Sequence, residues 1–195
     1  MKKILCTLFV LFTLATYGQE KKDEKIFIKE FNWTMISPEG FERMSQEEID
    51  HLRNRGIQVL ENGTGEELVD EVTVLFWIKK GTLNSLEANY QPFDEEVDGD
   101  YDETFDDVNE ISVAAIKDQF PQIQIDTVTS IEKIDRLNFR KFYMKLTYPG
   151  GVVLHNHSYS YLFGDKEFTV SISYVDEKFG QQMLNAWLKS KFRKE

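Results

Sequence analysis

Four consecutive segments in the second half of the chain alternate apolar and polar residues. They cover 123–131, 139–148, 152–163 and 168–174, and only short turns such as Pro149-Gly150-Gly151 separate them. Because the side chains of a β-strand point to its two faces in turn, this period of two indicates strands with one face toward a core. Strands joined by tight turns pair in antiparallel fashion. The sequence therefore predicts a four-stranded antiparallel meander.

The rest of the chain completes an α+β pattern. Alternation of apolar and polar residues predicts a strand at 31–36, and an apolar run rich in β-branched and aromatic residues predicts another at 72–78, with which a strand at 86–90 could pair. Apolar residues at helical spacing predict helices at 45–62, with an interruption at Gly56, at 104–120 and at 176–192. The first helix opens with a capping box, Ser45-Gln-Glu-Glu48. We expect an antiparallel sheet of about six to seven strands flanked by three helices.

Several segments carry a resemblance to the PsbP-like family. They are Phe31-Asn-Trp-Thr-Met-Ile-Ser-Pro38-Glu-Gly40-Phe41, Ile134-Asp-Arg-Leu-Asn-Phe139, Tyr159-Ser-Tyr161, 168–174 and Met183-Leu-Asn-Ala-Trp187 with the residues up to Phe192. The resemblance implies an α/β sandwich, shared with uncharacterised bacterial secreted proteins. It also implies a binding or accessory role, because an extrinsic photosystem II protein and a nuclear import cofactor with this fold are binding or accessory proteins rather than enzymes.

The first 18 residues have the composition of a signal peptide. Lys2 and Lys3 precede an uncharged apolar run over 4–15, and Thr16-Tyr-Gly18 offers small residues for cleavage. This run is shorter than the roughly 20 residues of a membrane span. Cys6 lies inside it, so no lipid anchor is expected. We expect a signal peptide at 1–18, a flexible leader at 19–30 and one domain at 31–195, which is secreted or periplasmic without stable membrane insertion.

Charge and cysteine content exclude several classes of function. The net charge is −11, and removing a leader with two lysines and no acid takes it to −13. This acidity argues against nucleic acid, because phosphate contacts need clustered lysine and arginine. Cys6 is the chain's single cysteine and would leave with the leader. A cysteine nucleophile, a disulfide and a cysteine-bound zinc are therefore excluded from the mature domain.

Two groups of residues could bind a metal ion. Asp98, Asp100 and Asp102 have the spacing that opens an EF-hand loop, but Glu103 and Asn109 stand where that loop needs glycine and a bidentate acid, so only a looser calcium site is considered. His155 and His157 would point to one face of a strand and could share zinc with nearby acids. The alternative is a pair of half-buried histidines beside the aromatic residues.

The aromatic row Tyr159, Tyr161 and Phe163 continues the strand face of the two histidines. It could line a groove for an apolar ligand, or it could pack beneath the C-terminal helix. No Gly-x-Ser-x-Gly elbow and no phosphate-binding glycine loop occurs in the sequence. The leading hypothesis is a non-enzymatic extracytoplasmic binding or accessory protein without a cofactor, whose partner is an unknown protein or small ligand. The alternative is a zinc- or calcium-binding protein, or a metal-dependent hydrolase, that uses His155, His157 and nearby acids.

Overall fold

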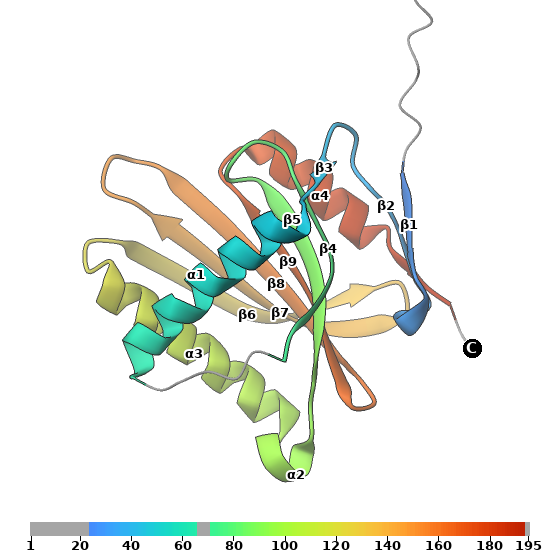
Figure 1. Cartoon of the computed structure of the whole chain (residues 1–195), viewed down its shortest axis with the longest axis horizontal. Coiled ribbons are helices and arrows are strands. Elements are labelled where there is room, and N and C mark those ends of the chain that lie inside the picture. Colours follow the sequence, from blue (N-terminus) through green and yellow to red (C-terminus); the bar gives the residue numbers. More distant parts are fainter. Residues whose placement is uncertain (1–23, 66–70, 194–195) are drawn as a thin grey trace, which may run out of the picture.

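A computed structural model describes residues 24–65 and 71–193 of the chain (Figure 1). Its main sheet has seven strands in the order β3-β4-β5-β9-β8-β7-β6, all antiparallel to their neighbours. These strands are β3 (Glu42–Arg43), β4 (Thr73–Lys79), β5 (Ser85–Pro92), β6 (Gln124–Ile134), β7 (Leu137–Thr147), β8 (Val153–Phe163) and β9 (Lys166–Tyr174). The predicted meander is confirmed as β6 to β9, and the α+β class with an antiparallel sheet is confirmed with it.

Helices cover both faces of this sheet (Figure 1). On one face lie α1 (Gln46–Thr64) and α3 (Tyr101–Gln119), preceded by the short α2 (Glu95–Asp98). On the other lie α4 (Glu177–Leu188) and a small sheet of β1 (Lys25–Ile28), β2 (Trp33–Ile36) and β10 (Lys191–Phe192), with a 3-10 turn over Lys29–Phe31. The aromatic core fills the space between this second layer and the main sheet, where Trp33, Phe168 and Trp187 are fully buried.

The two faces of the main sheet differ in chemistry because β8 and β9 keep their period of two. Tyr159, Phe168 and Val170 point into the aromatic core and are at most 1% exposed. The intervening residues are polar, with Ser158 and Ser160 on β8 and Thr169, Ser171 and Ser173 on β9. These polar residues face the side of α1 and α3. The two layers of helices therefore meet two unlike surfaces of one sheet.

The flexible leader predicted at 19–30 is wrong from Lys25 onward. Residues Lys25–Ile28 form β1, which pairs antiparallel with β2, and Ile26 is buried in the core. The charged residues around Ile26 hid this short alternation in the sequence. The last helix likewise ends at Leu188 rather than near 192, because Lys191 and Phe192 pair with β2 and bury the phenylalanine. The signal peptide predicted at 1–18 lies outside the described residues.

The helix boundaries also differ from the prediction. Helix α1 runs through Gly56 without a break, and its Ser45–Glu48 capping box is confirmed. Asp94 and Asp100 act as N-caps for α2 and α3, so α3 begins at Tyr101 and a fourth helix appears. Aspartate accepts backbone N–H bonds at a first helical turn, which turns part of the acidic stretch into helix starts. Within the described ranges, no helix is long and apolar enough to span a membrane.

Two helical glycines make a matched test of the packing between α4 and β9. A methyl group on Gly180 would lie 2.5 Å from ring carbons of Tyr174, whereas one on Gly56 would meet nothing within 4 Å. We expect Gly180→Ala to lower the free energy of unfolding by about 1–3 kcal/mol through overpacking. Gly56→Ala should raise it by about 0.5–1 kcal/mol through helix propensity. Urea denaturation measures both, and equal effects at the two positions would contradict the close approach of α4 to Tyr174.

Candidate functional site

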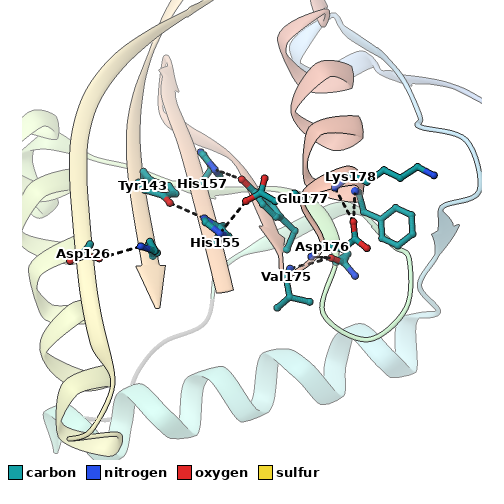
Figure 2. A network of polar contacts seen from close by, with 12 residues as sticks. Asp126, Tyr143, His155, His157, Val175, Asp176, Glu177 and Lys178 are labelled. Carbon is teal, nitrogen blue, oxygen red and sulfur yellow. Dashed lines mark hydrogen bonds and ion pairs between the residues drawn. The ribbon is translucent and has the colours of Figure 1, made fainter. Parts of the chain in front are cut away.

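The strand register gathers four ring side chains on the core-side face of the sheet, next to the start of α4 (Figure 2). His155 and His157 are two residues apart on β8 and therefore share this face. Tyr143 of β7 stands directly opposite His157, and Tyr174 of β9 stands directly opposite His155. Directly opposed residues of antiparallel strands lie on one face with their Cβ atoms about 5 Å apart. We call these four residues the imidazole–tyrosine cluster.

Hydrogen bonds join the cluster along its diagonals. The Tyr143 hydroxyl lies 2.8 Å from Nδ1 of His155, and Nε2 of the same ring lies 3.3 Å from a carboxylate oxygen of Glu177 in the first turn of α4. Because a carboxylate only accepts, Nε2 carries the proton that faces Glu177, and Nδ1 of a neutral ring then accepts from Tyr143. His157 completes the pattern with 3.3 Å between its Nε2 and the Tyr174 hydroxyl.

The rings also stack on one another. The rings of His155 and Tyr174 are nearly parallel, 12° apart with centroids separated by 4.9 Å. Tyr143 and His157 are 4.7 Å apart at 41°, and His157 is parallel to Tyr159 at a longer distance. Such contacts add to the burial of the rings and restrict their orientation. Stacking and hydrogen bonding therefore fix the orientation of the four rings.

Asn84 fixes the start of α4 and with it the position of Glu177. Its side-chain oxygen accepts backbone N–H bonds from Val175 and Asp176, and its amide nitrogen donates to the carbonyl of Lys80 in the β4–β5 turn. Asp176 then caps the helix by accepting from the N–H groups of the next turn. Asn84 is only 7% exposed, so losing it would leave these buried groups without partners.

Burial shifts the pKa values of His157, Tyr143 and Tyr174 away from neutral pH. Desolvation, followed by the charges of Lys141 and His155, lowers the pKa of His157 to about 4. Desolvation and the nearby Glu177 carboxylate raise the pKa of Tyr174 to about 12. The pKa of Tyr143 is raised by the same two causes and by Asp126. At pH 7 the His157 ring is therefore neutral and both tyrosines keep their hydroxyl protons.

A shallow hollow of about 360 Å³ opens over the cluster. Beside the four rings and Glu177, its lining includes Val128 and Ser130 from β6 and Lys141 from β7. Lys141 is held by Glu132 at 3.2 Å and lies over the Tyr159 ring. The hollow offers aromatic faces, hydroxyl groups and one charge of each sign. A surface of this kind can bind a polar or aromatic group by stacking and hydrogen bonding.

The structure separates the residues that the sequence grouped as metal ligands. His155 and His157 lie on the α4 side of the sheet. Asp98, Asp100 and Asp102 lie at the α2–α3 junction on the other side, where Asp100 caps α3 and Asp102 binds Arg140 at 2.6 Å. Among the described residues, no three His, Cys, Asp or Glu side chains are placed to hold one metal ion.

The predicted aromatic groove is occupied by the protein itself. Tyr159 is 1% exposed and packs against Trp187 of α4. Tyr161 and Phe163 pack against Phe139, Phe31 and Phe192. Tyr159, Tyr161 and Phe163 thus pack in the core, which was the alternative to a ligand groove in the sequence analysis. The sequence analysis missed Tyr143, Tyr174 and Glu177 as partners of the histidines, although Tyr174 ends the alternating segment 168–174.

The comparisons with known proteins concern the fold. No family model matches the chain, and no curated protein does. Among solved structures, it is similar to cyanobacterial PsbP (CyanoP) from Synechocystis sp. PCC 6803, with a TM-score of 0.57 and a likeness that covers 90% of this chain and 96% of that one. The chain has a PsbP-like fold. The sequences are 8% identical, so this PsbP likeness confirms the predicted architecture and concerns the fold alone.

The low pKa of His157 predicts that the folding stability decreases as the pH is lowered. Between pH 6.5, the ordinary histidine value, and pH 4, the unfolded chain binds a proton at residue 157 that the folded chain does not. The contribution of His157 to the free energy of unfolding therefore decreases as the pH is lowered from 6.5 to 4. His157→Gln removes this component, so the variant should lose about 1 kcal/mol less than the wild type between pH 7 and pH 5, after allowance for partial exposure of the ring.

Denaturant unfolding at the two pH values measures this difference. The carboxylates titrate in both proteins, so their contribution cancels in the comparison. If wild type and variant lost stability in parallel, His157 would not be buried as a neutral ring.

Proposed function

We propose that this protein is an exported, non-enzymatic binding or accessory protein that contacts a partner protein through the imidazole–tyrosine cluster and its hollow. The observation that carries the proposal is the hydrogen bonding of His155, whose two ring nitrogens are engaged between Tyr143 and Glu177. The PsbP-like fold supports an accessory or binding role. Export rests on the signal-like composition of residues 1–18.

Binding fits the cluster better than catalysis does. Tyr143, His155 and Glu177 stand in the order of a nucleophile, a base and an orienting acid. A nucleophile needs a lowered pKa or a strong base, but burial and two nearby carboxylates raise the pKa of the Tyr143 hydroxyl. The second ring, His157, is neutral over the physiological range. Tyr143 and His157 are thus positioned to stack and to form hydrogen bonds rather than to transfer protons at neutral pH.

The surroundings of the hollow favour a protein as the partner. It lies beside β6, an outer strand of the sheet, where Val128 is 56% exposed. Tyrosine and other aromatic residues are enriched in protein–protein interfaces, because they bury a large area with few rotatable bonds. The unpaired backbone of an outer strand can also accept an added strand. These features adjoin one another on this edge of the molecule.

The metal-dependent alternative keeps His155 and His157 as ligands with an acid such as Glu177, and no observation favours it. The carboxylate of Glu177 already accepts from His155, so a metal ion would have to displace this contact and the one to Tyr143. Elemental analysis of the purified protein tests this alternative. Stoichiometric zinc or calcium that is lost in the double variant His155→Ala/His157→Ala would favour it over the binding proposal. Steady turnover of an ester, phosphate or glycoside that one substitution in the cluster abolishes would do the same.

Export predicts a defined mature end. In cells that express the gene, the protein outside the cytoplasm should begin at Gln19, because cleavage follows Gly18. Fractionation followed by mass spectrometry of the N-terminal peptide measures this. Accumulation in the cytoplasm with Lys2 and Lys3 retained would contradict the exported half of the proposal and leave the binding half standing.

A site-specific photocross-linker tests the binding half. Placed at Ser130, in the lining of the hollow, it should give a discrete adduct of higher mass in intact cells. The same group at Glu47, exposed on α1, is the matched control and should give none. Tyr143→Phe, which removes one hydroxyl and keeps the ring, should weaken the Ser130 adduct several-fold. Equal adducts from both positions, or none from Ser130, would contradict this use of the hollow.

A further inference from the structure

A second cavity, of about 420 Å³, lies on the opposite side of the sheet between α3 and strands β5, β8 and β9. It is separate from the imidazole–tyrosine cluster, which lies on the α4 side. Its floor is the polar face of the sheet, and its roof is the first turns of α3. Enclosed volumes of a few hundred cubic ångströms are typical of small-molecule sites.

The floor of the cavity is a network of hydrogen-bonding side chains. Glu167 accepts from Ser160 at 2.6 Å and from the Gln91 amide at 2.8 Å. Ser160 is 2% exposed and lies 3.0 Å from the Thr169 hydroxyl. The network holds the Glu167 carboxylate in one orientation, because two donors from different strands fix it. A carboxylate held in this way is a preorganised acceptor for a positively charged donor.

The roof of the cavity is aromatic and carries one unused polar group. Phe93 and Tyr101 meet edge to face at 5.4 Å, and Phe105 follows one turn later on α3. The Tyr101 hydroxyl is buried close to Ser160, yet it has no hydrogen-bond partner of good geometry in the described part of the chain. A buried hydroxyl without a partner costs free energy, so a ligand that satisfied it would gain binding energy.

The charge of the lining is negative. Among the described residues that line it, three carry carboxylates and none is a lysine, arginine or histidine; the acids are Glu71, Asp98 and Glu167. The guanidinium of Arg140, which stands directly opposite Ser160 across β7 and β8, lies over the Phe105 ring and is paired with Asp102 and Asp106 at 2.6 and 2.7 Å. These two carboxylates offset its charge, so the acids of the lining disfavour an anionic ligand, whereas a cation would meet carboxylates and aromatic faces.

We propose that this cavity binds a small organic cation bearing a primary ammonium group, with Glu167 as the counter-ion, Tyr101 and the Ser160 and Thr169 hydroxyls as hydrogen-bond partners, and Phe93 and Phe105 as the aromatic wall. An ammonium group donates three hydrogen bonds and accepts none, which matches a floor of carboxylate and hydroxyl oxygens. This site goes beyond the proposed partner-binding surface and does not depend on it.

Calorimetric titration of the purified protein with 1,4-diaminobutane tests the proposal, with 1,4-butanediol as the neutral probe of equal length. We expect saturable one-to-one binding of the diamine and at least about 10-fold weaker binding of the diol. Glu167→Gln keeps the shape of the side chain and should weaken the diamine about 10-fold or more. Tyr101→Phe removes the unpartnered hydroxyl and should weaken it about 3- to 10-fold.

Glu47→Gln is the control for general attraction of a cation to an acidic protein. It removes one exposed carboxylate on α1 by the same substitution, and it should bind the diamine as the wild type does. Thermal unfolding of each variant checks that it is folded. The proposal is overturned if the diamine does not bind at millimolar concentration, if the diol binds equally well, or if all three variants weaken binding alike.

Discussion

The two-residue period of β8 and β9 is the constraint on which the rest of the molecule depends. It places Tyr159, Phe168 and Val170 on one face and Ser160, Thr169 and Glu167 on the other. A slip of one residue would exchange the two sets and leave a row of hydroxyl and carboxylate groups against the aromatic core. The register is therefore fixed by burial on one face, and the polar face is aligned as a consequence. Both candidate sites are built from this one alternation.

The core-side face of the main sheet is covered over only part of its area. Helix α4 and the small sheet cover the part of this face around Phe139. There the Trp187 ring packs against Phe139 and Trp33 at centroid distances of 5.1 and 5.7 Å. The helix starts only after Tyr174, and Asn84 fixes that point through two backbone hydrogen bonds. Beyond it the sheet continues uncovered, and the imidazole–tyrosine cluster lies there. Gly180 lets the helix pass close to Tyr174, so the last ring of the core is also the first ring of the cluster.

Much of the fold could be predicted because it depends on local patterns. The meander, the Ser45 capping box and the Asp176 cap are each encoded within a few neighbouring residues. What the prediction missed depends on partners distant in sequence. The strand at Lys25–Ile28 exists because β2 is beside it, and Phe192 leaves the last helix because its ring fills a gap beside Trp33.

In the candidate sites, too, local features could be predicted from the sequence and features that depend on distant contacts could not. The shared face of His155 and His157 follows from strand periodicity alone. Their partners do not, because Tyr143 is set by the β7–β8 register and Glu177 by the point at which α4 begins. The two candidate metal groups, the histidines and the acids at 98–102, lie on opposite sides of the sheet, which no local pattern could show. The unpartnered Tyr101 hydroxyl likewise depends on how α3 lies over the sheet, which no local pattern specifies.

The central claim is that the register of β7, β8 and β9 assembles the imidazole–tyrosine cluster. Nitrogen-detected NMR of the imidazole rings across a pH titration tests it most directly, because it reports the protonation state and tautomer of each ring. The account predicts that His157 stays neutral until the pH approaches about 4. It also predicts that His155, in its neutral form, carries its proton on Nε2. A His157 that titrates near 6.5, with both rings averaging between tautomers, would show imidazoles free in solvent and would contradict the cluster.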